Sequence, residues 1–189
     1  VASQANKCVV EVSAVKNEDN WENIVYDDVN SVSGTIVWEN ALEIIILAPA
    51  RIMKDAQSLN VTFSDGVTYP ASLKKQDRNL GMAVFSVERR LLSSSTAGQI
   101  VAATLGNSNI VGKGDPVIAL GKQFGYAGGT GYGIISSVKN RVAVADGEYR
   151  LLTTDIAAAP GGSGALFNTN GEVIGIIDQK ITDNESMNL

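Results

Sequence analysis

Short runs rich in β-branched and aromatic residues recur along almost the whole chain, and turn residues separate them. Three of the separators, Asp65-Gly66, Asp146-Gly147 and Asn170-Gly171, are dipeptides typical of tight β-hairpins. No segment carries a long helical period, so the pattern predicts an all-β sandwich or barrel. The predicted strands cover residues 8–15, 33–38, 43–48, 60–64, 68–73, 82–87, 99–104, 115–121, 131–138, 141–145, 149–154, 164–168 and 172–178.

A polar, serine-rich break at residues 88–98 divides these strands into two sets of about six. The simplest arrangement is two six-stranded antiparallel barrels with a cleft between them, and such a cleft is a natural binding site. We therefore expect an N-terminal barrel over 1–90, a linker and the start of the second barrel over 91–104, and a C-terminal barrel over 105–189. Residues 49–56 have room for one helical turn.

Composition excludes several functional classes. Apolar residues make up 44% of the 189 residues and charged residues 19%, which is typical of a globular protein. The net charge of −5 argues against a nucleic-acid partner. The chain has no histidine and one cysteine, Cys8, which is expected to be a buried apolar residue, so a zinc site of the usual kind is excluded. We expect neither a metal nor a cofactor.

The glycine-rich segment at residues 125–133 invites comparison with a phosphate-binding loop. It does not fit the spacing of such loops, no Lys-Ser or Lys-Thr pair follows it, and it leads into a predicted strand. Phosphate binding needs a helix N-terminus or a comparable nest of N–H groups at this point. The segment is therefore predicted to be a surface loop.

The segment at residues 151–176, LLTTDIAAAPGGSGALFNTNGEVIGI, resembles the nucleophile region of HtrA-like serine proteases of the trypsin fold. Residues 105–138 and 61–87 carry further motifs similar to that family, so the resemblance extends over most of residues 31–178. It implies two six-stranded antiparallel β-barrels with a cleft between them, in agreement with the strand pattern.

The resemblance places the family's catalytic triad on three positions of this chain. Ser163 stands at the position of the nucleophile, Arg51 at that of the histidine and Gly81 at that of the aspartate. The family's oxyanion hole would use the backbone N–H groups of Gly161 and Ser163. The resemblance also implies a substrate pocket lined by Ile156, Ala157, Ala158, Gly175 and Ile176, with an apolar preference.

The chemistry of the triad fails at two of these positions. A serine hydroxyl needs a neighbouring base that takes its proton in the transition state. Arg51 cannot act as that base because its pKa exceeds about 12, and Gly81 has no side chain to orient one. Loss of the base costs on the order of 10⁶ in rate. We therefore expect a pseudoprotease: a domain that binds peptides or proteins in the cleft without hydrolysing them.

Two alternatives stay open. Ser163 could be activated by a lysine in an unconventional hydrolase, although the candidates Lys54, Lys122 and Lys139 are predicted to be exposed and a lysine base needs burial. The barrels could also serve only in structure or assembly. Arg51 is expected to be a cleft-side charge that pairs with an acidic group, for example the terminal carboxylate of a peptide. Asp155 is expected to accept backbone hydrogen bonds.

The expected partner is a peptide or protein that adds a strand along the edge of the cleft. By resemblance, the protein would work outside the cytoplasm or at the cell surface, with a membrane anchor upstream, a PDZ domain downstream and assembly into homo-oligomers. The longest apolar run, residues 44–50, is too short to span a bilayer.

Overall fold

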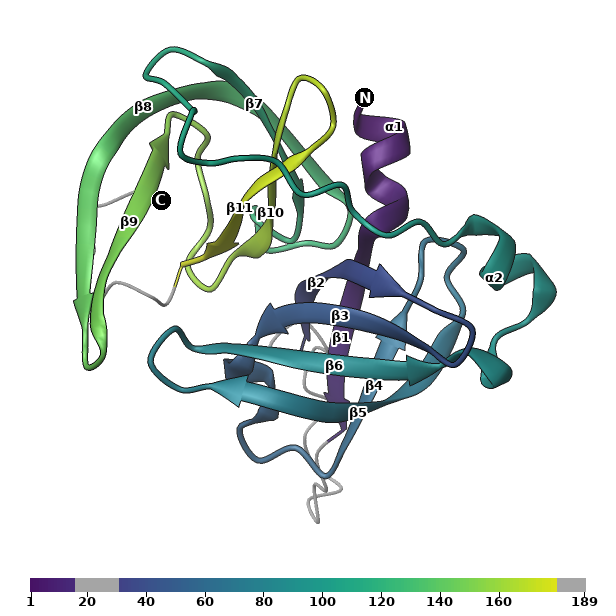
Figure 1. The fold of residues 1–189 in the computed structure, drawn as a ribbon. Coiled ribbons are helices and arrows are strands. Elements are labelled where there is room, and N and C mark those ends of the chain that lie inside the picture. Colours follow the sequence, from purple (N-terminus) through teal and green to yellow (C-terminus); the bar gives the residue numbers. More distant parts are fainter. Residues whose placement is uncertain (16–30, 180–189) are drawn as a thin grey trace.

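The computed structural model describes residues 1–15 and 31–179. The first sheet is a closed barrel in the order β1-β2-β3-β6-β5-β4 (Figure 1). Pairing of β1 with both β2 and β4 closes it, so every strand in this barrel has a neighbour on each side. The strands are β1 (Val9–Val15), β2 (Ser31–Glu39), β3 (Glu43–Pro49), β4 (Ser58–Thr62), β5 (Thr68–Asp77) and β6 (Met82–Glu88).

The second sheet is a curled, antiparallel array in the order β11-β10-β7-β8-β9. In Figure 1 it lies beside the barrel, and the N-terminal segment runs up next to it. The all-β fold with two curled lobes is confirmed, and the second lobe has five strands in the part that the structure describes. They are β7 (Pro116–Gly121), β8 (Gly129–Val144), β9 (Gly147–Thr154), β10 (Ser163–Asn168) and β11 (Val173–Asp178).

Three predicted strands differ in the structure. The predicted strands at 131–138 and 141–145 join into one long strand, β8, which ends at Val144, because its pairing with β9 continues across the register shifts on both sides of Ser137. Residues 99–104 form no strand. Gln99 is the last residue of the helix α2 (Ser94–Gln99), and the residues after it make single hydrogen bonds, such as that from the Ala103 N–H to the Ile36 carbonyl at 2.8 Å. Both segments have strand composition, but only pairing with a neighbour makes a strand.

Short helices occupy the ends and connections. The predicted helical turn within 49–56 is confirmed as a 3-10 helix, η3, directly after β3. Within the described ranges, no helix is long and apolar enough to cross a membrane. The helices are α1 (Ala2–Ala5), η1 (Asn6–Cys8), η3 (Ala50–Met53), η4 (Arg89–Leu91) and α2 (Ser94–Gln99).

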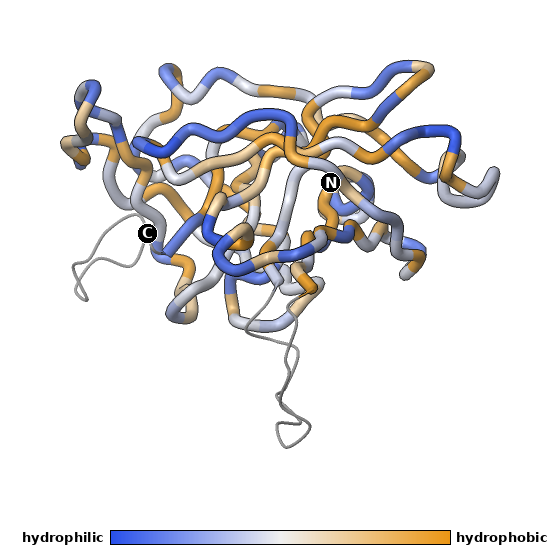
Figure 2. Tube along the Cα trace, turned by 90° about the horizontal axis from the view of Figure 1, so that it is seen from below, coloured by the Kyte–Doolittle hydropathy of each residue, from blue (hydrophilic) through white to orange (hydrophobic). Residues whose placement is uncertain are grey.

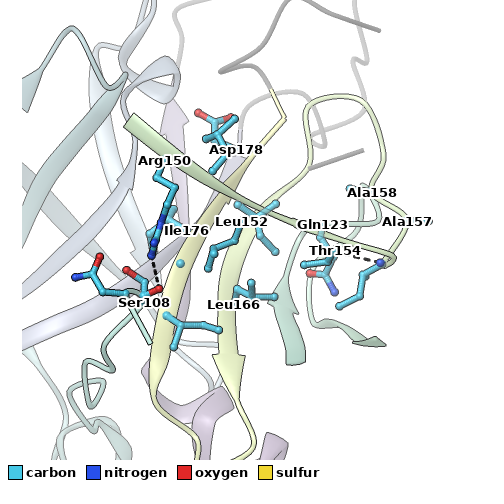
Figure 3. A pocket seen from close by; sticks show the side chains of 16 residues that line it. Ser108, Gln123, Arg150, Leu152, Thr154, Ala157, Ala158, Leu166, Ile176 and Asp178 are labelled. Atoms are coloured by element: carbon cyan, nitrogen blue, oxygen red, sulfur yellow. Dashed lines mark hydrogen bonds between the residues drawn. The ribbon is translucent and has the colours of Figure 1, made fainter. Parts of the chain in front are cut away.

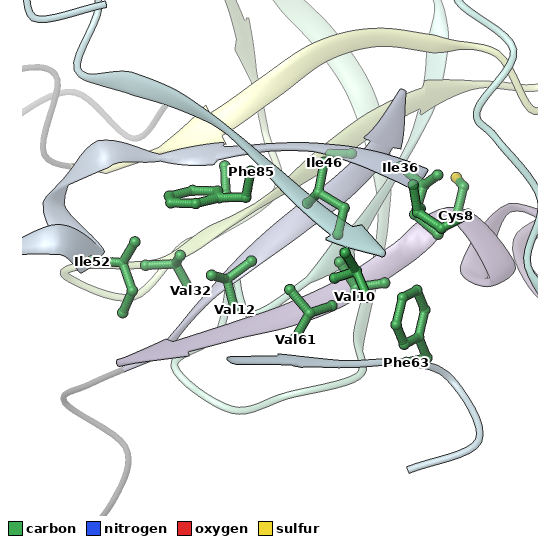
Figure 4. Packing of buried hydrophobic residues seen from close by; sticks show 14 of the residues in the cluster. Cys8, Val10, Val12, Val32, Ile36, Ile46, Ile52, Val61, Phe63 and Phe85 are labelled. Atoms are coloured by element: carbon green, nitrogen blue, oxygen red, sulfur yellow. The ribbon is translucent and has the colours of Figure 1, made fainter. Parts of the chain in front are cut away.

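The main core fills the closed barrel. Alternate residues of β1 are buried, as expected for strands with one face inward. In Figure 4 the side chains of Val12, Ile46, Val61 and Phe85 point into the space between the strands. Cys8 belongs to this core, as predicted, and burial raises the pKa of its thiol to about 11. Hydrophobic and hydrophilic stretches alternate along the chain (Figure 2).

Polar side chains anchor α2 to the barrel. Thr96 is buried, and its hydroxyl donates to Asp65 Oδ2 at 2.6 Å and meets the Tyr69 hydroxyl at 3.0 Å. Ser93 caps the helix, because its Oγ accepts from the Thr96 N–H at 3.1 Å. The bond from Thr96 is the main reason that the pKa of Asp65 lies below its ordinary value of 3.8.

Replacement of Thr96 by valine is expected to lower the free energy of unfolding by about 1–3 kcal/mol at pH 7, because Asp65 and Tyr69 lose a buried partner. The pKa of Asp65 is lower in the folded state than its ordinary value of 3.8 in the unfolded chain, so the ionised carboxylate stabilises the folded state at pH values above 3.8. This stabilisation is lost as the pH falls through the lowered pKa of the folded state. The difference between variant and wild type should therefore shrink below about pH 4. Urea unfolding at several pH values measures it. The control Thr68→Val, at an exposed hydroxyl, should change stability by less than about 0.5 kcal/mol.

Candidate functional site

Arg51 lies in η3, at the end of the barrel that faces the second sheet. The backbone of Gly81 helps to place it, since the Gly81 carbonyl accepts from the Ala50 N–H at 2.6 Å. Gly81 has φ of 66°, a left-handed conformation that glycine adopts without strain. The residues predicted at the histidine and aspartate positions are thus brought together through Ala50, but Gly81 contributes only backbone.

The guanidinium of Arg51 bridges from the barrel to the second sheet. Its Nε lies 3.2 Å from Asp178 Oδ1, and its Nη2 donates to the Gly161 carbonyl at 2.6 Å. The side chain of Asp178 is only 4% exposed and that of Arg51 is 21% exposed. Arg51 therefore pairs with an acidic group at the end of β11 in its own chain, and it also binds the turn before Ser163.

Ser163 is the first residue of β10, and its side chain is fully buried at 0% exposure. Its Oγ accepts a hydrogen bond from the Ser33 N–H of β2 at 2.8 Å. The hydroxyl is therefore directed toward the backbone of the barrel. This bond ties the first sheet to the second across 130 residues of sequence.

The two N–H groups predicted for an oxyanion hole belong to a tight turn. Gly161 has φ of 73°, and the next residue, Gly162, donates its N–H to the Ala159 carbonyl at 2.8 Å. The Ser163 N–H is directed at the Lys122 carbonyl, 3.4 Å away. An oxyanion hole requires N–H groups that point at the developing charge. Here the Ser163 N–H has a protein partner in β-type pairing.

The lysines differ in burial. Lys54 and Lys139 are exposed, as predicted, whereas the prediction of an exposed Lys122 is wrong. Lys122 is 5% exposed, and its Nζ donates to Ser31 Oγ at 2.7 Å. Lys122 follows β7 directly, and β7 pairs with β10. In this position the side chain of Lys122 reaches Ser31 of β2 in the barrel. No sequence pattern distinguishes such a lysine from a surface lysine in a loop.

A cavity of about 250 Å³ lies beside the turn at residues 159–162 (Figure 3). The five residues predicted for the substrate pocket, Ile156, Ala157, Ala158, Gly175 and Ile176, all lie on its wall. Sequence reasoning did not find the residues from other strands that complete the wall, because their approach depends on how the sheet curls. These include Gln123, Leu152, Thr154 and Leu166.

Asp155 directly follows β9 and stabilises the end of this strand next to the cavity. Its Oδ1 accepts from the Ile134 N–H at 2.7 Å, which confirms the predicted backbone hydrogen bond. Ile156 N–H donates to Thr154 Oγ1 at 3.2 Å. As for metals, the described residues contain no cluster of three or more acidic, cysteine or histidine side chains that could hold an ion.

Comparison with known proteins gives a consistent result. Residues 32–176 match the family described as trypsin-like peptidase domain. A probable periplasmic serine endoprotease, DegP-like, from Halomonas elongata is 34% identical over 151 residues, which cover 79% of this chain and 29% of the relative. The serine protease Do-like HtrB from Bacillus subtilis is 30% identical over 158 residues, covering 80% of this chain and 33% of the relative. The chain thus spans about a third of the length of these curated relatives.

Solved structures agree with these relatives. The HtrA-type protease AlgW, solved with a tripeptide, superposes with a TM-score of 0.71 at 25% identity, over 93% of this chain and 53% of that chain. A variant of AlgW solved with a decapeptide gives a TM-score of 0.72, also at 25% identity, over 93% of this chain and 56% of that chain. The arrangement of the barrel and the curled sheet is therefore that of HtrA-type proteases.

Replacement of Ser163 by alanine is expected to destabilise the fold by about 1–2 kcal/mol, because it leaves the buried Ser33 N–H without its acceptor. A serine that merely fills a turn in solvent would tolerate this change. Urea unfolding measures the loss, and amide hydrogen exchange at Ser33 should rise with it. Unchanged stability together with unchanged exchange at Ser33 would contradict the described role.

Replacement of Arg51 by methionine is expected to lower the free energy of unfolding by about 1–3 kcal/mol, since Asp178 and the Gly161 carbonyl both lose a charged donor. The matched control is Arg141→Met, which breaks an ion pair with Glu148 whose side chains are both exposed. Such surface pairs contribute about 0–1 kcal/mol. Equal losses in the two variants would show that the Arg51 bridge adds nothing.

Proposed function

Because the chain belongs to the trypsin-like peptidase family, with relatives among the HtrA and DegP proteases, we propose that it is a pseudoprotease that binds peptides or proteins in the region between its two lobes. The barrel over 1–90, the connection over 91–104 and the part over 105–189 would act together as one domain. In this proposal Ser163, Arg51 and Gly81 occupy the three triad positions of the family, and hydrolysis is lost.

The orientation of Ser163 is the observation that carries the proposal. A nucleophile must present its oxygen to a substrate and to a base. The Ser163 oxygen is fully buried and is held by the Ser33 N–H. The chain has no histidine, and Arg51 at the position of the family's histidine is a protonated guanidinium that pairs with Asp178.

A lysine-based hydrolase receives little support from the geometry. A lysine can act as the base for a serine only if its Nζ can take a proton from the nucleophile oxygen. The Lys122 Nζ donates to Ser31 Oγ at 2.7 Å, whereas the bonds between Lys122 and Ser163 join their backbones. The second alternative, a purely structural domain, offers no account of the cavity lined by residues 156–158 and 174–178.

Strand addition gives a route for peptide binding that needs no triad. In the described sheet, β11 is an outer strand: β10 pairs along one edge, and on the other edge only Val173, at its start, is bridged to Leu105. The rest of β11, residues 174–178, lines the cavity, so an extended peptide that pairs with this part of the edge would lie next to the cavity. The AlgW structures were solved with a tripeptide and a decapeptide, which supports a peptide as the ligand class.

The setting of the protein is proposed from its relatives. Several of them are named periplasmic, which supports a place outside the cytoplasm or at the cell surface. An anchor upstream, a PDZ domain downstream and assembly into homo-oligomers are further parts of the proposal. A nucleic-acid partner does not fit the net charge of −5.

Two assays test the loss of hydrolysis. The protein is expected not to cleave casein above background and not to react with a fluorophosphonate probe, because Ser163 is buried and has no base. An active HtrA protease serves as the positive control. Hydrolysis at a normal protease rate that the Ser163→Ala variant abolishes would overturn the proposal. Labelling of Ser163 in the folded protein would overturn it as well.

A further inference from the structure

A second cavity, of about 300 Å³, lies between the barrel and the second sheet. It shares no lining residue with the cavity beside the turn at residues 159–162. One wall belongs to the barrel and is made by the start of β1, by Ser33 of β2 and by the turn that follows β4. The opposite wall is the end of β7 and the glycine-rich loop after it. Its lining residues are Gly121, Lys122, Ala127 and Gly128.

Glu11 supplies a carboxylate on the barrel wall of this cavity. The residues on either side of it, Val10 and Val12, face the core, so the Glu11 side chain is on the outer face of β1. Strand pairing places Ser33 on one side of Glu11 and Thr62 on the other. In the described part of the chain, no hydrogen bond or ion pair reaches the Glu11 carboxylate.

The carboxylate can be reached from solvent. Glu11 is only half-buried, and the mouth of the cavity is formed by exposed residues from both lobes. A ligand therefore needs no opening of the fold to contact Glu11. The exposed residues of the mouth are Asn6, Ser64, Gly66, Ala127 and Gly128.

Lys122 is the other charged residue of the wall. It is 5% exposed, and its Nζ donates to Ser31 Oγ at 2.7 Å. Ser31 lies two residues before Ser33, which is about 6.6 Å along β2, so the ammonium group is directed away from the pair of Ser33 and Glu11. In the described ranges no ion pair joins Lys122 to Glu11. The charge that a ligand meets in this cavity is therefore negative.

The rest of the wall suits the stem of a long basic side chain. Val9 lies on the same face of β1 as Glu11, and Phe63 and Ala127 add further apolar surface. Lysine and arginine pack their methylene stems on such surfaces while the charged group contacts an acceptor. A guanidinium can donate two parallel hydrogen bonds to one carboxylate. The volume is at the lower end of the range for small-molecule sites, so it suits one side chain.

We infer that this cavity binds one cationic side chain, an arginine or a lysine, of a partner peptide. The Glu11 carboxylate accepts the hydrogen bonds of the charged group, and the apolar wall holds the stem. The net charge of −5 favours the approach of a basic partner. The inference goes beyond the proposed peptide binding along β11 and does not depend on it, because the two cavities share no residue.

The first experiment uses n-butylguanidinium and n-butylurea, which have closely similar shapes and differ in charge. In NMR titrations of the wild-type protein at about 0.15 M salt, where long-range attraction is screened, butylguanidinium is expected to bind about fivefold more tightly. It should shift the amide signals of Glu11, Ser33 and Gly128. Equal affinities for the two compounds would overturn the inference.

A pair of variants separates the local carboxylate from the overall charge. Glu11→Gln keeps the shape of the side chain and should abolish the preference for butylguanidinium. The control Glu88→Gln changes the net charge by the same amount at a residue that lines neither cavity and pairs with Arg90 on the surface. It should retain the preference. Equal losses in both variants would overturn the role of Glu11. The wild-type comparison remains decisive if Glu11→Gln fails to fold.

The second experiment tests a peptide as the source of the side chain. Fluorescein-labelled nonapeptides, Ala-Ser-Ala-Ala-X-Ala-Ala-Ser-Ala, carry arginine or its neutral analogue citrulline at X. Fluorescence anisotropy should give about fivefold tighter binding of the arginine peptide to the wild-type protein and equal binding of both to Glu11→Gln.

The outcomes also separate this inference from the proposed function. Peptides that bind equally well, together with equal affinities for butylguanidinium and butylurea, would overturn the cation site and leave peptide binding intact. A preference for butylguanidinium that Glu11→Gln abolishes, with no difference between the two peptides, would overturn the peptide as the source of the cation. A preference for the arginine peptide that depends on Glu11 supports the inference even if no peptide pairs with β11.

Discussion

The contact between β2 and β10 is the constraint on which the rest of the structure depends. The Ser33 N–H donates to the buried Ser163 Oγ, and the backbones meet so closely that a methyl group at Gly121 would lie 2.6 Å from Ser33 Oγ and 2.8 Å from the Gly164 Cα. Glycine at 121 also adopts φ of 134°. This joint sets the relative position of the two lobes. Only with that position can Arg51, from the barrel, reach Asp178 and the Gly161 carbonyl in the second sheet.

The same polar groups that suit catalysis also suit structure. A serine at the start of a strand can either present its hydroxyl to a substrate or bury it against backbone N–H, and in this chain it does the second. An arginine in η3 can neutralise a buried carboxylate and donate to a carbonyl at the same time, and a neutral side chain could not supply the charge. Both side chains therefore take part in the joint between the two lobes.

Much of the architecture is readable from the sequence because hairpin signals are local. The turns at Asp65-Gly66 and Asn170-Gly171 and the strands around them depend on residues close in sequence, and they occur where they are predicted. The union of two predicted strands into β8 and the absence of a strand at 99–104 depend on pairing partners, which composition does not encode. Both differences reflect long-range contacts.

The residues of the candidate site also fall into two groups, those that could be predicted from local sequence and those that depend on long-range contacts. The five predicted cavity residues lie in segments with recognisable motifs, so their common location could be anticipated. The burial of Lys122 and the direction of the Ser163 hydroxyl could not, because the first depends on Ser31 and the second on Ser33, each more than 90 residues away in sequence. Glu11 is similar: the cavity that it lines forms only where the second lobe meets the barrel.

The bridge made by Arg51 has a consequence for the conditions under which the protein keeps its shape. A histidine at this position would gain or lose its charge near neutral pH, whereas a guanidinium remains charged at every pH at which proteins fold. The chain contains no histidine at any position. Among the residues that the structure describes, the joint between the lobes therefore contains no imidazole. A joint built in this way holds the two lobes together without relying on an imidazole.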